Sequence, residues 1–501
     1  MKSILLSAAC ALLFGAMVCG QSAAQGFGQP AHASGGTGST ILLATPYASS
    51  TAISNAYSGS VTTVRATAET IPLSLDDAIR RGLEHNLALV LAQQNQRIAS
   101  GTELQGLNYL LPNISAQAAR NRNDINLVAL GFRPGLLAQF PPGIIPPGTT
   151  LGPVVTVNEV SAQANLQQSL FDLSAIEEYR AEKEKQTVAY YQMESTRGFV
   201  ILDVATSYLQ ALADAANVAN ARGLLDADAV LQQQTKDADT AGTATHLDLL
   251  RAQVQYQQQE QVLIADQNAL DKAKIALNRQ IGLPAEQPIQ LTDQTPYADL
   301  AQTTIEQARR IAYANRQDYQ GMQAQLRAAD RQRSAARYER LPSLSFQGNY
   351  GVTGTVGGIY HGTFLAEGNL SVPLFREASL RGDRDVAEAS KNNALSQLAD
   401  LHTKIEAQLR DSLLDIAASK QLVEVARSNV DLAHTSLSDA TDRFKNGVDD
   451  NLPVVQAQAT LASAQAQLVN SLYQFNQSKL GLARNLGIIE QQYHAYLGNG
   501  K

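Results

Sequence analysis

One sequence unit occurs twice in this chain, and that repeat limits the folds the chain can adopt. Five pairs of segments match in the same order. The pairs are Leu75–Arg81 with Ile305–Arg310, Leu111–Ser115 with Leu341–Ser345, Leu166–Phe171 with Leu370–Phe375, Gly242–Gln253 with Gly447–Gln458, and Ala276–Gly282 with Gly481–Gly487. Chance similarity between helical segments would not keep the Pro, Phe and Gly positions in register. We therefore predict two tandem copies of one structural unit.

The repeat also predicts domain boundaries. The first copy is expected at residues 73–287 and the second at 302–489, with a linker at 288–301 and a C-terminal tail at 490–501. The spacing between the copies shortens from 230 residues to 204 between Pro112 and Leu166. The first copy alone therefore carries a Pro- and Gly-rich loop, at 132–153.

The N-terminus is typical of a secretory signal peptide. Lys2 precedes an apolar run, and Ser22-Ala23-Ala24 forms a small-residue cleavage pattern, which predicts a signal peptide at 1–24. Both cysteines lie within it, so the mature chain would contain none. Lipid attachment at Cys19 stays open as an alternative, although Val18 is larger than the residue expected before a lipidated cysteine.

Residues 25–72 are rich in Gly, Ser, Thr and Ala and carry almost no charge up to Thr70. Such a composition cannot bury much core, so a flexible N-terminal segment is expected. No later segment is expected to be long and apolar enough to cross a membrane as a helix.

Each copy contains a predicted β-hairpin. Leu344, Phe346 and Tyr350 alternate with polar residues, and the strands are expected at about 113–123 and 157–170, then 343–352 and 363–374. Alternation over about ten residues is typical of transmembrane β-strands, although a half-buried soluble sheet gives the same pattern.

Long helices follow both hairpins. No proline interrupts 174–241 or 378–446, and a continuous helix of that length would be about 100 Å long. Small and apolar residues recur at helical spacing and predict coiled-coil seams. The predicted seams are Ile201, Val204, Tyr208, Ala211, Ala215 and Val218, and then Val455, Ala459, Ala462, Ala466, Val469 and Tyr473.

Four strands cannot close a membrane barrel, which needs at least eight. A membrane tolerates no open sheet edge, so the chain must combine strands with other copies of itself. Two copies give eight strands and an interior filled by side chains, whereas three give twelve strands and room for a water-filled lumen. A homotrimer is the simplest arrangement, with the long helices extending the barrel into a periplasmic tunnel.

From Leu73 to Gly487 the chain resembles TolC-like outer membrane efflux proteins. The resemblance rests on Leu-Pro before each first strand, Leu-Phe after each second strand, and Gly-x4-Leu at the start of each final helix. It implies a mainly α fold with a membrane β-barrel part, in which a trimer forms a 12-stranded barrel and an α-helical tunnel. It also implies outer-membrane lipid around the barrel, a periplasmic adaptor, an inner-membrane transporter, export of small molecules or proteins, and neither enzymatic activity nor a cofactor.

The resemblance also implies a periplasmic aperture at the turns between the long helices and the returning helices. Asp248 falls on a position of the family's closing network, whereas Phe444 lacks the hydroxyl that a tyrosine would supply there. Pro453 replaces the second-copy equivalent of Asp248, so Asp449 and Asp450 are candidates for the missing charge. The candidate aperture residues are Asp248, Phe444, Asp449, Asp450 and Gln456, and the candidate adaptor-docking residues are Gly242, Leu247, Gly447 and Leu452.

Other chemistry has little support in the sequence. The seven histidines are scattered without metal-ligand spacing, so no metal site is expected. The net charge of −7 and the absence of a basic, aromatic-interleaved run argue against nucleic acid as a partner. The alternative function is a secreted periplasmic coiled-coil structural or adaptor protein without a pore.

Overall fold

The computed structural model describes residues 59–61, 65–126, 128–129, 154–293, 297–300, 303–356 and 358–497. These residues belong to one compact unit, Asn55–Lys501. The predictions for the signal peptide, for Cys19, for most of the N-terminal segment and for the loop at 132–153 lie outside the described residues.

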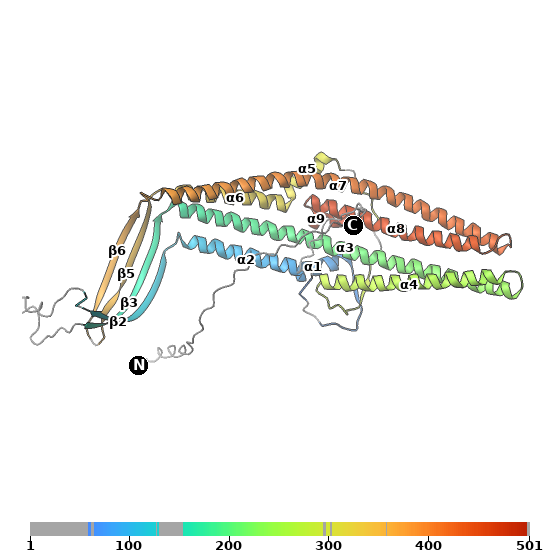
Figure 1. The fold of residues 1–501 in the computed structure, drawn as a ribbon, viewed down its shortest axis with the longest axis horizontal. Coiled ribbons are helices and arrows are strands. Elements are labelled where there is room, and N and C mark those ends of the chain that lie inside the picture. The colour runs from blue at the N-terminus through green and yellow to red at the C-terminus, as the bar shows by residue number, and fades with distance from the viewer. Residues whose placement is uncertain are drawn as a thin grey trace, which may run out of the picture. The chain divides into compact units, whose positions relative to one another are not determined.

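The two halves of the chain share one order of elements (Figure 1). The first half consists of β1 (Ile71–Leu73), α1 (Leu75–His85), α2 (Leu87–Asn108), β2 (Asn113–Asn126), β3 (Val154–Phe171), α3 (Leu173–Thr240) and α4 (His246–Gln280). The second consists of β4 (Ile289–Leu291), α5 (Ile305–Asn315), α6 (Gln317–Tyr338), β5 (Ser343–Thr355), β6 (Tyr360–Ser371), α7 (Glu377–Lys445) and α8 (Leu452–Asn485). Helix α9 (Ile489–Leu497) follows.

Matching caps begin the first helix of each half. The Ser74 side chain accepts a hydrogen bond from the backbone of Asp77 at 3.2 Å, and that of Thr304 accepts one from Gln307 at 3.3 Å. Each cap satisfies a backbone donor that has no partner inside its helix. Pro112 and Pro342 stand between a helix and the strand that follows it, where they prevent the helix from continuing.

The four long strands form one antiparallel sheet in the order β2-β3-β5-β6. Strands β3 and β5 join the two hairpins, and Asn165 lies opposite Asn349 in their register. Each repeat therefore contributes one hairpin, and the outer edges of β2 and β6 pair with no other described strand.

Helices α3 and α7 contain 68 and 69 residues and follow β3 and β6 after one and five intervening residues. Helix α3 packs against α4 and α6, and α7 packs against α8. The seam predicted on α3 includes the buried residues Ile201, Val204, Tyr208 and Ala211.

The seam predicted on α8 was only partly right. Val469 is buried, and Ala462 and Tyr473 pack against the hydrophobic cores, whereas Ala459 and Ala466 are exposed. Leu461, which lies outside the predicted seam, is buried, and it removes more apolar surface from water than either exposed alanine would.

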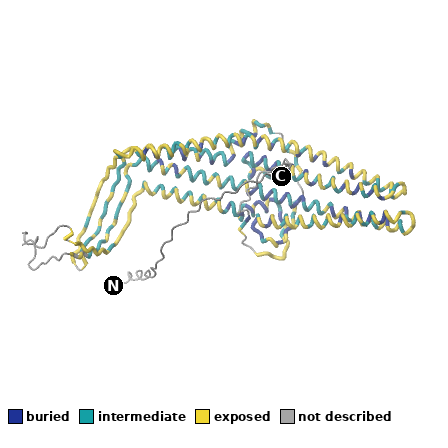
Figure 2. The backbone as a smooth tube through the Cα atoms, viewed as in Figure 1, coloured by how far each residue is buried: buried dark blue, intermediate teal, exposed yellow. Residues whose placement is uncertain are grey.

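The main hydrophobic core lies where the two halves meet (Figure 2). There β1 pairs in parallel with β4, and Leu73 lies opposite Leu291. The buried Tyr208 hydroxyl donates to the backbone oxygen of Leu73 at 3.0 Å and lies 2.8 Å from the carboxylate of Asp293. The first residues of one repeat are thus tied to the segment that precedes the next.

One described helix, α3, is long and apolar enough to cross a membrane by length and composition alone, contrary to the sequence expectation. Half of its apolar stretch is buried within the protein. The same properties are found in the core helices of proteins that do not cross membranes, and here the stretch packs into the main core.

Candidate functional site: a two-faced sheet and two paired turns

The four-stranded sheet has one apolar face and one polar face. The registers align Ala164, Tyr350 and Phe364 on one face. The apolar side chains of that face include Ile114, Ala116, Ala118, Ala162, Leu166, Phe346, Val352, Ala366 and Leu370, whereas Gln168 and, at the far end of β2, Arg120 and Arg122 are polar. Tyr350 is 71% exposed and Phe364 76% exposed. So large an exposed apolar surface requires lipid or another protein to cover it.

The opposite face is mostly amide, hydroxyl and carboxylate. The residues of this polar face include Asn113, Ser115, Gln117, Gln163, Asn165, Gln167, Ser345, Gln347, Asn349, Glu367 and Asn369. Leu365 is the one large apolar side chain in the central part of this face. A sheet with this division of side chains suits lipid on one side and water on the other.

Acidic residues extend the polar face toward the helices. An open cavity of about 830 Å³ is lined by polar-face residues such as Gln167 and Ser345 and by Glu178, Glu339 and Asp383. Burial and the nearby charge of Glu339 raise the pKa of Glu178, and burial and Asp383 raise that of Glu339. The polar side of the junction between sheet and helices is therefore acidic.

The two turns that follow the long helices share one backbone conformation. Gly242 and Gly447 have φ values of +74° and +70°, in the left-handed region that glycine adopts without steric cost. The helices that follow begin differently. Thr245 and Asp248 form a capping box at the start of α4, whereas the Asn451 side chain makes no capping hydrogen bond at the start of α8.

Two side chains connect the first turn with the second. The Nη1 atom of Arg251 lies 3.2 Å from Oδ1 of Asp248 and 3.4 Å from Oδ2 of Asp450. The fully buried Asn451 donates through Nδ2 to the backbone oxygen of Asp248 at 2.7 Å. A shared cation and a buried amide therefore hold the two turns against each other.

The structure brings together only some of the residues predicted from sequence. Asp248 and Asp450 share Arg251, whereas Asp449 pairs with Arg443 inside its own turn at 2.6 Å. Both candidates for the missing charge, Asp449 and Asp450, are thus paired with arginines. The other candidates surround the turns. Phe444 is half-buried, Gln456, Gly242 and Gly447 are exposed, and Leu247 and Leu452 are 55% and 39% exposed.

Sequence reasoning missed Arg251, Arg443 and Asn451. The repeat itself offered one signal. Arg251 aligns with Gln456 and Asp248 aligns with Pro453, so the two charged residues occur together only in the first copy. An acid and a base three residues apart on a helix face each other, so this pair could have been identified in the first copy. Asp450 and Asn451, which contact this pair from the second turn, could not be identified in this way.

Within the described part of the chain, no group of three or more His, Cys, Asp or Glu side chains is placed to hold a metal ion. The polar groups at the turns are engaged with one another.

The described structure thus combines a sheet with one apolar and one polar face, long helices that follow its strands, and paired turns beyond those helices. The model of the outer membrane efflux protein family matches residues 78–283 and 308–488. The chain belongs to the outer membrane efflux protein family.

Similar proteins agree with this assignment. The toluene efflux pump outer membrane protein TtgF of Pseudomonas putida is 27% identical over 325 residues, which cover 63% of this chain and 64% of that protein, slightly under two thirds of its length. The outer membrane protein TolC of Escherichia coli is 22% identical over 377 residues, which cover 69% of this chain and 73% of that protein.

Solved structures share the fold. The Campylobacter jejuni CmeC outer membrane channel matches with a TM-score of 0.68 and 17% identity, covering 83% of this chain and 86% of that one. The open state of the Neisseria gonorrhoeae MtrE outer membrane channel matches with a TM-score of 0.65 and 17% identity, and the match covers 87% of this chain and 95% of that one. The predicted mainly α fold with a membrane β part and two repeats is confirmed.

Proposed function

We propose that this chain is one protomer of a homotrimeric export channel that crosses the outer membrane and continues as a helical tunnel into the periplasm. The observation that carries the proposal is the sheet, whose four strands have one apolar face, one polar face and two open edges. The family membership favours this channel over the alternative of a periplasmic structural or adaptor protein.

The open edges determine how copies would assemble. Unpaired backbone groups at β2 and β6 are costly in lipid, so β6 of one copy pairs with β2 of the next until the ring closes. Three copies supply twelve strands, with the polar faces around a wide lumen and the apolar faces toward lipid. Water and polar cargo would then contact the amide-rich face and the acidic junction.

One side chain supports a seam at that edge. Phe375, after β6, is 100% exposed, whereas its first-repeat equivalent Phe171 is 46% exposed and lies opposite Leu344 of β5. The second hairpin thus covers Phe171 within the chain. In the ring, the first hairpin of the next copy would occupy the same position beside Phe375.

The partners follow from the two ends of the tunnel. Leu247 and Leu452 are exposed beside the two glycine turns, where a periplasmic adaptor would dock and connect the channel to an inner-membrane transporter. The contacts of Arg251 with Asp248 and Asp450 would form part of the closed aperture, with Phe444, Asp449 and Gln456 around it. The chain would act as a channel rather than as an enzyme.

The cargo class is proposed from the relatives. Several are named for efflux of toluene, solvents or antibiotics. We assign this channel to small organic molecules of that kind rather than to proteins. Deletion of its gene should sensitise the cells to toluene, and the wild-type gene should restore growth.

Fractionation and conductance test the channel itself. The chain should remain with outer membranes, run as a trimer in detergent and give ion conductance in planar bilayers. Recovery as a folded, detergent-independent monomer in the periplasm would refute the proposal and support the structural or adaptor alternative.

A further inference from the structure

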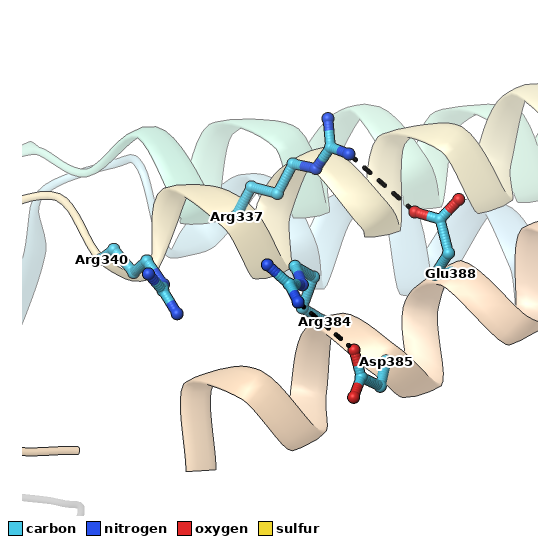
Figure 3. A pocket seen from close by; sticks show the side chains of 5 residues that line it. All are labelled: Arg337, Arg340, Arg384, Asp385 and Glu388. Atoms are coloured by element: carbon cyan, nitrogen blue, oxygen red, sulfur yellow. Dashed lines mark ion pairs between the residues drawn. The ribbon is translucent and has the colours of Figure 1, made fainter. Parts of the chain in front are cut away.

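An arginine cluster lies at the junction between the second hairpin and its helices (Figure 3). An open cavity of about 470 Å³ there is lined by Arg337, Arg340, Arg384, Asp385 and Glu388. Arg337 is 3.9 Å from Glu388 and Arg384 is 3.6 Å from Asp385, both beyond ordinary hydrogen-bond distance. Arg340 pairs with Glu377 at 2.6 Å through one of its nitrogens. The three arginine side chains are 44–49% exposed, so they keep hydrogen-bond donors for a ligand.

The cluster belongs to the second repeat alone. Eight basic and five acidic residues lie on either side of the second hairpin, in segments 331–342 and 372–391. The matching segments 101–112 and 168–187 of the first repeat contain three basic and six acidic residues. One junction is thus net positive and the other net negative, although the fold does not require the difference.

The cluster faces away from the polar side of the sheet. Helix α6 packs between α3 and α7 of the same chain, so its exposed residues face either the lumen or the exterior. Ala335 and Asp383 line a cavity on the acidic polar side. At about 100° per residue, Arg337 lies about 160° around α6 from Ala335. Asp385, which lines the arginine cavity together with Arg384, lies about 160° around α7 from Asp383. The arginines therefore belong to the outer surface.

Their height along the strands matches the edge of a bilayer. The apolar face of β5 runs from Leu344 to Val352, about 27 Å at ~3.4 Å per residue, and the lipid-facing band of such barrels is about 25 Å tall. Arg340 precedes Leu344 by only four residues. The cluster therefore lies at headgroup level on the side of the long helices, which is the periplasmic leaflet.

We propose that Arg337, Arg340 and Arg384 bind the phosphate groups of anionic phospholipids in the periplasmic leaflet of the outer membrane. The inference rests on the proposed channel function. A guanidinium group binds phosphate oxygens in a bidentate manner, and clustered basic side chains next to a membrane attract anionic lipid. Each copy in the ring would hold lipid between α6 and α7, next to its own second hairpin.

The test compares R337Q/R340Q/R384Q with R97Q/R222Q/R410Q, which removes the same charge from exposed arginines elsewhere. Native mass spectrometry of the detergent-purified trimer, titrated with phosphatidylglycerol, should show at least fivefold weaker binding for the cluster variant only. Phosphatidylcholine should discriminate less between the variants, and inorganic phosphate at millimolar concentration should not compete. Competition by inorganic phosphate would show a free-anion site and would overturn the lipid assignment.

Two further measurements keep the outcome clear. If the triple variant fails to trimerise, R337Q and R384Q singly should each weaken binding at least twofold, and unchanged binding in both overturns the proposal. A cluster variant that binds phosphatidylglycerol like wild type but loses adaptor capture would assign the surface to protein instead. Bilayer conductance of the wild-type chain tests the channel separately, so an intact channel with unchanged lipid affinity refutes only the lipid site.

Discussion

Arg251 and Asp450 are 199 residues apart in sequence, yet the guanidinium group of one lies 3.4 Å from the carboxylate of the other. The same guanidinium group also pairs with Asp248, whose side chain is only 8% exposed. One cation therefore serves a buried acid in the first turn and an exposed acid in the second. This contact is where the two unequal repeats meet at the proposed aperture.

Arg251→Ala should loosen the paired turns. It leaves the largely buried carboxylate of Asp248 without its cation, at a cost of about 1–3 kcal/mol, and it frees Asp450. Single-channel recordings should show at least twofold higher conductance or longer openings. Arg222→Ala, which removes an exposed arginine of α3 away from the turns, is the control. Equal conductance in both variants and wild type would refute the role of Arg251.

The two neighbouring aspartates should differ in effect. Asp450→Asn removes the pairing between the turns and should raise leak through the closed tip, whereas Asp449→Asn removes only a pair within the second turn and should leave leak nearly unchanged. The double replacement Asp449→Ala with Asp450→Ala should raise cation leak and weaken block by divalent cations. A larger effect of Asp449→Asn than of Asp450→Asn would contradict this order.

Phe375→Ala should weaken the trimer. The ring would bury a side chain that is fully exposed in the single chain, and full burial of such a side chain contributes about 1.5–3 kcal/mol. The trimer should therefore dissociate at lower temperature on semi-native electrophoresis. Phe364→Ala, on the apolar face of β6, controls for general loss of apolar surface. The same trimer stability in wild type and Phe375→Ala would exclude this seam.

Asp228→Asn should make stability less sensitive to a rise in pH through about 6. Asp228 is 2% exposed on α3, and burial raises its pKa to about 6, against a smaller opposing effect of Gln255. Because the folded-state pKa lies above the ordinary value of 3.8, its stabilising effect is complete below about pH 4 and is lost as pH rises through about 6.

Thermal unfolding followed by circular dichroism measures this effect. The variant should gain about 1–2 kcal/mol over wild type between pH 5 and pH 8, because about one pKa unit of the shift, or about 1.4 kcal/mol, falls in that range. The exposed neighbour Asp226 provides the control, since Asp226→Asn should follow wild type at both pH values. A constant difference between Asp228→Asn and wild type from pH 5 to pH 8 would show that Asp228 is not a buried titrating acid.

The sequence by itself determined the repeat, the alternating strands and the long helices. These features depend on neighbours close in the chain, such as the caps at Ser74 and Thr304, the glycine turns at Gly242 and Gly447, and strand alternation. Local patterns of this kind can be identified from the sequence alone, and so Asp248 could be placed at a turn before its partners were known.

Only the tertiary structure decided which side chains meet. The pairing of Arg251 with Asp450 and the buried bond from Asn451 join segments about 200 residues apart, and no local pattern encodes them. The buried face of α8 also departed in part from the predicted seam, since Leu461 is buried whereas Ala459 and Ala466 are exposed. Contacts between distant segments depend on how the helices pack, and the two repeats form different contacts because their turn residues differ.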